Sequence, residues 1–487
     1  MTYTCIIQKM NILKLLTTVG FFTLLSRLTG FVRSMLLAFF LGASVTSDAL
    51  LVSIRISNFL RKILAEGAFN ACFVPIFSKI LNTKGHEKAE ELASKAYSIL
   101  LFTTVIITIF TVIFYGYVLK TFAPGFNGER LSLSLKLGRI CFPFIISTCI
   151  VSLISGVLNT LGKFAIPSFL QALVNIGSIV AITLAFLFNF DYATSVAIGF
   201  LITGTLQVII IQTYAAKFNF HFHITKNLIS PEIKQVIKKM IPSTLSSGVW
   251  QINLLIDSQV ASLLSTGAIS YIFYADQIIQ LPLSTLGIAI GSALIPVFSK
   301  SIQTEKIKEL KLSFNKTLIL SIGFGLPASA AFFCLSEPIV SFITGRGAFL
   351  HKDVLCVASV LKIFSLALPA YILNKIITSL FFAYSNTKIP FKSTIINLVT
   401  NVIGLFLFVP HLSYNGIALS NVIAAYVSII YLYISIPKRI SIMKFTKKIL
   451  LKQFLATVCL AISMIYSNSL LPDFFYFGFL KKFSYLS

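Results

Sequence analysis

Long apolar runs recur along the chain and are separated by short polar segments. A helix needs about 20 apolar residues to cross a bilayer, and thirteen runs are clear candidates. They lie at 15–40, 44–77, 97–119, 138–161, 166–188, 194–215, 240–265, 268–298, 314–335, 354–384, 389–410, 414–436 and 450–467. A further aromatic run, Leu471–Ser487, is short and contains Lys481 and Lys482, so we expect an incomplete or interfacial segment there. The pattern predicts an all-α polytopic membrane protein.

The composition agrees with this class of protein. Hydrophobic residues make up 56% of the 487 positions and charged residues only 11%, and the mean hydropathy is +0.91. A soluble domain carries about 25% charged residues. The net charge of +25 could indicate a nucleic-acid partner, but the basic residues lie in short loops between apolar runs, which is typical of membrane proteins. We therefore expect a bilayer and no nucleic acid.

Basic residues alternate between successive loops. The loops after the second, sixth, eighth and twelfth runs are rich in lysine, whereas those after the fifth, seventh and eleventh contain no lysine or arginine. The third and ninth loops keep a few basic residues, Arg130 among them, which weakens the signal there. Because basic loops stay in the cytoplasm, the even-numbered loops and the N-terminus are predicted to be cytoplasmic.

The chain repeats itself at an offset of about 222 residues. Three short motifs occur in both halves: Phe73–Lys79 as Leu294–Lys300, Ile166-Pro167 as Ile389-Pro390, and Asn175 as Asn397. The offset equals an even number of spans, so both copies have the same orientation. This predicts two parallel six-helix lobes, related by an axis along the membrane normal, with the substrate site between them. We place the lobes at 10–217 and 234–437, followed by extra helices at 446–487, the last one short or incomplete.

Charged residues stand within the first two apolar runs, where each costs roughly 2.5–3.5 kcal/mol at bilayer depth. They are Arg27, Arg33, Asp48, Arg55, Arg61, Lys62 and Glu66. Four of them share an arc of about 40° on a straight helix: Asp48, Arg55, Lys62 and Glu66. The mostly positive set predicts a watery cavity for an anionic ligand, and structural ion pairs between two helices are the alternative. Gly30 is expected to loosen the first helix so that both of its arginines reach this cavity.

Ionisable groups are sparser in the later spans. Asp257 and Asp276 each stand in an apolar run, which is typical of a cation or proton site, although a structural partner explains Asp276 equally well. The motifs of metalloproteases, serine hydrolases and P-loop ATPases are absent from the sequence. We therefore expect a transporter rather than an enzyme, without a cofactor, and driven by ion, voltage or substrate gradients.

Three segments resemble the signature of the MurJ (MviN) lipid II flippase family. They are Ser26–Arg33 (SRLTGFVR), Thr46–Ala49 (TSDA) and Asn58–Phe69 (NFLRKILAEGAF), of which the last is highly specific. Tyr274-Ala275-Asp276, Pro282 and Ile295-Pro296 are similar to the family's second-lobe motif. The likeness extends from about residue 10 to 467. It implies the multidrug/oligosaccharidyl-lipid/polysaccharide exporter fold and transfer of lipid II, the undecaprenyl-pyrophosphate-linked peptidoglycan precursor, from the inner to the outer leaflet.

By matching motif, the resemblance implies that the central cavity is lined by Arg27, Arg33, Arg55 and Arg61 together with Asp48. Two departures matter: Ser34 stands where the family commonly has an aspartate, and Gln277 where many members have a cavity arginine. Pyrophosphate recognition should therefore rely on the first lobe. Some members bind sodium, and the corresponding positions imply at most a weak sodium site at Asp257, Asn397 and Asn401.

The resemblance also implies a location in the bacterial inner membrane, and a monomer that works alongside the cell-wall synthesis machinery. Two alternatives remain open. A polysaccharide-lipid flippase or a drug exporter would share the fold, although an exporter of organic cations should line its cavity with carboxylates rather than arginines. A non-transporting scaffold for cell-wall assembly has no use for a buried cationic stripe.

The predicted topology places the N-terminus in the cytoplasm and the loop Thr266–Ile269 outside. A cysteine introduced at Ser265 should react with a maleimide added from outside, and one at Lys306 should not, because lysine-rich loops are cytoplasmic. The reverse labelling pattern would overturn the assignment of the spans.

Overall fold

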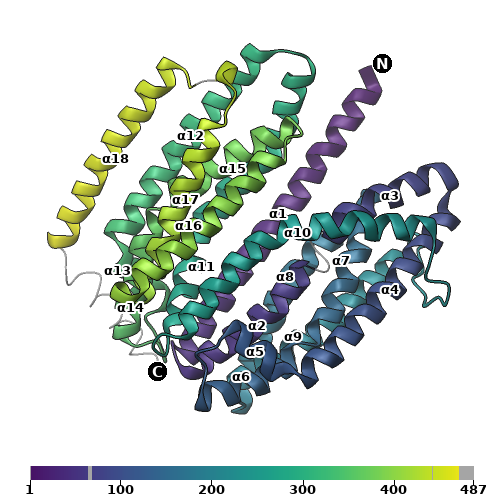
Figure 1. The fold of residues 1–487 in the computed structure, drawn as a ribbon, viewed down its shortest axis with the longest axis horizontal. Coiled ribbons are helices and arrows are strands. Elements are labelled where there is room, and N and C mark those ends of the chain that lie inside the picture. Colours follow the sequence, from purple (N-terminus) through teal and green to yellow (C-terminus); the bar gives the residue numbers. More distant parts are fainter. Residues whose placement is uncertain (1, 64–67, 441, 471–487) are drawn as a thin grey trace. The chain divides into compact units, whose positions relative to one another are not determined.

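The computed structural model describes residues 2–63, 68–440 and 442–470, and this part of the chain forms helices without a strand (Figure 1). The predicted all-α class is confirmed. The helices are α1 (Thr2–Leu41), α2 (Val45–Arg61), α3 (Ala68–Lys84), α4 (His86–Ile113), α5 (Tyr115–Phe122), α6 (Gly128–Cys141), α7 (Phe144–Thr160), α8 (Ala165–Phe188), α9 (Tyr192–Ala216), α10 (Pro231–Ser262), α11 (Ala268–Gln303), α12 (Ile307–Cys334), α13 (Ser336–Thr344), α14 (His351–Ser365), α15 (Leu368–Ala383), α16 (Lys388–Leu412), α17 (Tyr414–Ile434), η2 (Lys438–Ile440) and α18 (Lys444–Leu470). Glu66 and the expected fourteenth segment, Leu471–Ser487, lie outside the described residues.

In the part of the chain that the structure describes, the thirteen apolar runs lie largely on these helices. Within the described residues, nine helical segments are long and apolar enough to span a bilayer, or ten if the pair α14–α15, bent by 42°, counts as one span. Four predicted spans are each shared between two helices: 44–77 by α2 and α3, 97–119 by α4 and α5, 138–161 by α6 and α7, and 354–384 by α14 and α15. Pro143 and Pro369 stand at two of these breaks, as expected for a residue that cannot continue the hydrogen bonding of a preceding helix.

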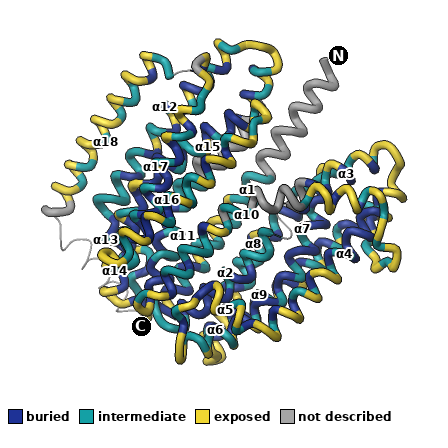
Figure 2. Tube along the Cα trace, in the orientation of Figure 1, coloured by how far each residue is buried: buried dark blue, intermediate teal, exposed yellow. Residues whose placement is uncertain are grey.

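Large apolar side chains cover the outward faces of the long helices. Ile106, Phe110 and Ile113 on α4 are exposed, as are Ile462 and Ile465 on α18. Lipid chains contact such surfaces favourably, whereas in water they would promote aggregation. α18 is the extreme case, because its apolar segment has no buried position among the described residues, and Figure 2 draws it as mostly exposed.

Contacts divide the chain into unit 1, residues 1–269, and unit 2, residues 270–487. In unit 1, α1 packs along α8, α8 along α9, and α2 on α6. Aromatic rings meet at Phe22–Phe169 and again at Phe40–Phe186, so α1 and α8 run parallel, as the first and fifth spans must. Gly199 lets α8 and α9 approach closely, since a Cβ there would lie 2.6 Å from the Cβ of Ala181.

Unit 2 repeats the packing order of unit 1. α16 packs along α17 as α8 does along α9, α15 packs on α17 as α7 does on α9, and α12 packs on α15 as α4 does on α7. A duplication with parallel orientation predicts this arrangement. The division at Ile269 falls one helix later than the predicted lobe boundary, because α10 packs on α3, α4 and α5. The predicted lobe limits, 10–217 and 234–437, stay a prediction.

Candidate functional site

The arginines predicted to bind the ligand lie on two consecutive helices of unit 1. On α1, Arg27 is exposed and Arg33 is half-buried, and on α2 both Arg55 and Arg61 are half-buried. α1 runs through Gly30 as one continuous helix, so this glycine does not interrupt it. The turn at residues 42–44 joins the two helices.

Among the described residues, the polar groups next to these arginines add little negative charge. α2 ends at Arg61, whose Nε donates to Asn58 Oδ1 at 3.2 Å, and half-buried Lys62 follows. Ser34 is buried, and its hydroxyl donates to the carbonyl of Gly30 at 3.0 Å. The serine is therefore satisfied within α1 and brings no carboxylate beside Arg33.

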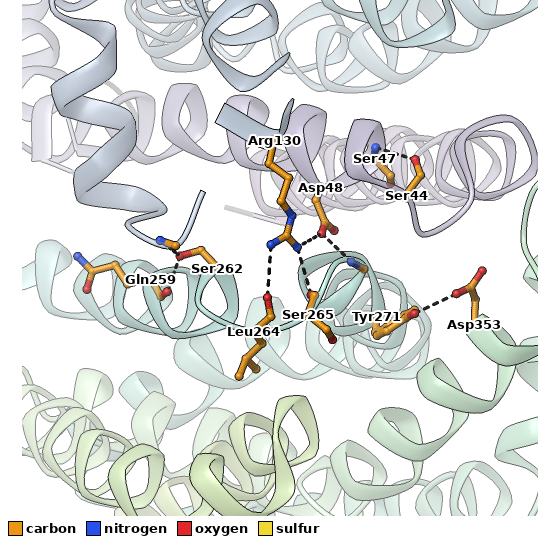
Figure 3. Close-up of polar contacts among 12 residues, drawn as sticks. Ser44, Ser47, Asp48, Arg130, Gln259, Ser262, Leu264, Ser265, Tyr271 and Asp353 are labelled. Atoms are coloured by element: carbon orange, nitrogen blue, oxygen red, sulfur yellow. Dashed lines mark hydrogen bonds and ion pairs between the residues drawn. The ribbon is translucent and has the colours of Figure 1, made fainter. Parts of the chain in front are cut away.

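Asp48, an acid predicted to line the same cavity, is fully buried at the start of α2, where it lies beside Arg130 (Figure 3). Its Oδ2 accepts from Arg130 Nη2 on α6 at 2.9 Å and from the backbone N of Gly267 at 2.8 Å. Arg130 also donates to the carbonyls of Leu264 and Ser265, at 3.3 and 3.1 Å. A buried carboxylate is tolerated only with partners of this kind. In this structure Asp48 joins α2, α6 and the segment that follows α10.

A second set of contacts ties the end of α10 to the connection between α5 and α6. Ser262 Oγ accepts from the backbone N of Gly125 at 3.1 Å, and Gln259 Nε2 donates to Thr121 O at 2.6 Å. Gly125 leaves no room for a side chain, since a Cβ there would lie 2.3 Å from Ser262 O. The predicted topology places these contacts at the outer end of the helices. We call both sets together the outer latch: Asp48, Thr121, Gly125, Arg130 and residues 259–267.

Unit 2 contains a hydrogen bond at the corresponding position. There the acid lies on the later of the two helices, α14, whereas in unit 1 it lies on the earlier one, α2. Tyr271 OH donates to Asp353 Oδ1 at 2.9 Å, and Asp353 Oδ2 accepts from the backbone N of Leu350 at 3.0 Å. Tyr271 and Asp353 follow Asp48 and Arg130 by the offset that relates the two halves. Sequence reasoning missed Arg130, which looked like an ordinary loop residue. Its repeat relation to Asp353 is the signal that could have indicated its role.

The remaining predicted residues are spread over both units. Asp276 on α11 is half-buried and accepts from Gln280 Nε2 at 3.5 Å. Asp257 belongs to unit 1, and Asn397 and Asn401 lie one turn apart on α16 of unit 2. Within the described ranges no group of three or more His, Cys, Asp or Glu side chains could hold a metal ion. The sodium site at Asp257, Asn397 and Asn401 stays a prediction.

A polar cluster lies at the opposite end of α10, near the end of α3 and the start of α4 and outside the predicted apolar runs. Lys84 Nζ on α3 lies 2.9 Å from Glu232 Oε1 on α10, and Glu91 on α4 pairs with Lys95 at 2.7 Å and with Lys88 at 2.9 Å. Hydrogen bonds from Lys95 and Lys88 lower the pKa of Glu91 to about 2, and one from Lys84 lowers the pKa of Glu232. Both carboxylates are therefore charged at neutral pH, and α10 is tied to unit 1 near both of its ends.

Comparison with known proteins identifies the family. The family model described as Lipid II flippase MurJ matches residues 37–485. The chain belongs to this family. The probable lipid II flippase MurJ of Rickettsia prowazekii is 32% identical over 417 residues, which cover 85% of this chain and 82% of the relative. That of Buchnera aphidicola subsp. Schizaphis graminum is 35% identical over 441 residues, covering 87% and 83%.

Solved structures agree with the family assignment. A structure of lipid II flippase MurJ in an inward closed conformation matches with a TM-score of 0.79 and 26% identity, covering 94% of this chain and 99% of the other. An inward-facing multidrug resistance MATE transporter of the MOP superfamily matches with a TM-score of 0.71 and 16% identity, covering 90% and 95%; this second likeness shows the fold alone. The resemblance to the MurJ family seen in the motifs is confirmed.

Replacing Arg130 by glutamine should lower the free energy of unfolding by about 3–5 kcal/mol, because it leaves the Asp48 carboxylate buried without its cation. Denaturant unfolding of the purified protein measures this loss. Adding Asp48→Asn should recover part of it, since the uncompensated charge is then removed. The matched control is Lys306→Gln, which breaks an exposed pair with Glu309 and should cost at most about 1 kcal/mol. If the double variant recovers nothing, the ion pair is not what holds the latch.

Proposed function

We propose that this protein moves lipid II from the inner to the outer leaflet of the bacterial inner membrane. The observation that carries the proposal is the match of the family model over residues 37–485. Relatives named lipid II flippase MurJ cover most of the chain. The two arginine-bearing helices support the same ligand, because lipid II combines an apolar tail with an anionic pyrophosphate.

Recognition of the pyrophosphate relies on the cations of α1 and α2: Arg27, Arg33, Arg55, Arg61 and Lys62. A guanidinium binds two phosphate oxygens through parallel hydrogen bonds and keeps its charge at any physiological pH. Half-burial strengthens such contacts, because the surrounding dielectric constant is lower than that of water. Compared with the family pattern, Ser34 leaves the first lobe with one acid fewer and Gln277 leaves the second lobe with one cation fewer. The first lobe therefore contributes most of the pyrophosphate binding. Glu66 and Asp276 complete the proposed polar lining.

The proposed mechanism is alternating access, in which the two lobes rock so that the cavity faces one leaflet at a time. A doubly charged head group cannot cross hydrocarbon unaided, whereas a cationic cavity replaces its hydration while the tail stays in the bilayer. The outer latch supports this mechanism, because it holds the outer end of α10 against α2 and the α5–α6 connection. With α10 in the second lobe, as the predicted boundary at residue 234 has it, opening toward the outer leaflet requires Asp48 and Arg130 to release residues 264–267.

Membrane voltage can return the empty carrier without ATP. A cationic cavity is drawn toward the negative interior with about 2.3 kcal/mol per charge per 100 mV, whereas bound pyrophosphate nearly cancels that charge. A sodium ion held by Asp257, Asn397 and Asn401 would be a second source of energy. We further propose that the N-terminus lies in the cytoplasm and that the protein acts as a monomer beside the cell-wall synthesis machinery.

Neutralising Arg33 or Arg61 should abolish the rescue of a strain depleted of its own lipid II flippase, while the protein level stays near normal, because these charges serve the ligand. Arg27→Lys should impair rescue, since lysine cannot form two parallel hydrogen bonds. Lys306→Gln, which removes an exposed cation of unit 2, is the control and should rescue fully. Loss of protein together with function would indicate structural ion pairs. Full rescue by every variant would favour a scaffold that does not transport.

A disulfide across the outer latch should hold the carrier closed on the outside and stop flipping. Cysteines at Val45 and Thr266 flank the bond between Asp48 and Gly267, and they avoid Gly267 itself, whose φ of 90° would strain a cysteine. Rescue should fail under oxidising conditions and return on reduction. Each single-cysteine variant should rescue under both conditions. Continued delivery of precursor by the fully cross-linked protein would contradict the rocking mechanism.

A further inference from the structure

The position of α1 against its neighbour α8 determines where Arg27 and Arg33 lie. This helix packs mainly on α8, and the two ring contacts between them lie toward the ends of the interface. Apolar contacts are non-directional, and between helices in lipid they have no hydrophobic driving force. They hold the helices together but leave the register and the rotation of α1 weakly defined.

A directional polar contact crosses this interface next to the arginines. Asn175 Nδ2 on α8 donates to the carbonyl of Ser26 at 3.0 Å, and Ser26 directly precedes Arg27. Gly30 lies one turn further along α1, where a Cβ would come within 3.2 Å of the same Nδ2. The glycine thus leaves room for the amide, and a Cβ at this position would require the amide to shift by a few tenths of an ångström.

Other hydroxyls in this stretch of α1 bond within their own helix. Thr29 donates to the carbonyl of Leu25 at 2.8 Å, and Ser34 donates to that of Gly30 at 3.0 Å. These bonds do not depend on where α1 sits against α8. The bond from Asn175 does, since it forms only when one particular carbonyl of α1 faces one particular position of α8.

We propose that Asn175 is a positioning residue that sets the register and rotation of α1, and so holds Arg27 and Arg33 where both reach one pyrophosphate. A slip of one residue would move these side chains by about 1.5 Å and turn them by about 100°. Bidentate contacts to two linked phosphates do not tolerate such a displacement. The inference rests on the proposed function, because it takes the pyrophosphate as the ligand.

The binding test compares undecaprenyl pyrophosphate with undecaprenyl phosphate on protein in nanodiscs. Asn175→Leu removes the amide at similar volume and should weaken binding of the pyrophosphate several-fold while changing binding of the monophosphate little, because one guanidinium still holds one phosphate. Gly30→Ala should give a smaller loss of the same selectivity, because its Cβ crowds the amide. Ser178→Ala is the matched control on α8, since its hydroxyl donates to Val174 within that helix at 2.9 Å, and it should keep the wild-type preference.

The register is measured separately from the ligand. Spin labels at Leu28 on α1 and Val180 on α8, both exposed, should report a shifted or broadened distance in Asn175→Leu and an unchanged one in Ser178→Ala. An unchanged distance in Asn175→Leu overturns the proposal. So does an equal loss of affinity for both lipids with a lower unfolding temperature, which indicates a merely structural role. A wild-type protein that neither prefers pyrophosphate nor rescues a flippase-depleted strain refutes the proposed function instead, whatever the distances show.

Discussion

The free energy of placing charge away from water is the constraint on which this structure depends, and unit 1 meets it in two different ways. At the start of α2, Asp48 is fully enclosed and its charge is met by Arg130 and by backbone groups. Further along the same helix, Arg55 and Arg61 keep half-buried positions, where a ligand can still replace solvent. Within one helix the acid is thus enclosed by its partners in the fold, whereas the arginines proposed to bind the substrate stay partly accessible.

The helices that support the arginine-bearing helices run parallel or antiparallel to one another and make few polar contacts. Small residues bring α8 and α9 close together, and α8 in turn supports α1. Hydrogen bonds between helices, such as the one from Asn175 to Ser26, add direction to this packing. The duplication repeats this framework in unit 2 but changes its polar chemistry: a tyrosine–aspartate bond replaces the buried ion pair. The framework can thus be kept while the charge of each half is altered.

The sequence predicted the features that depend on local composition. Apolar runs predicted helices, and the repeat predicted the packing order that both units share. Contacts between residues that are far apart in the chain could not be predicted from the sequence. A helical wheel describes a single helix, so it grouped Asp48 with Arg55 without showing that Arg130, 82 positions away in the chain, lies beside the carboxylate. Equally, α10 follows the linker expected to separate the lobes, yet bonds at both of its ends attach it to unit 1. Such pairings depend on tertiary contacts that no periodicity encodes.

Within the outer latch, the bonds made by Asp48 and Arg130 are chemically one-sided. Asp48 and Arg130 contribute side chains, whereas residues 264–267 contribute main-chain atoms to these bonds: two carbonyls and the amide of Gly267. Every amino acid offers the same carbonyl, so the side chains of Leu263, Ser265 and Thr266, which are exposed, can change without altering the bonds that close the latch. This short segment is therefore a natural attachment point for a fluorescent reporter, which would follow opening of the outer end while leaving the closing interaction intact.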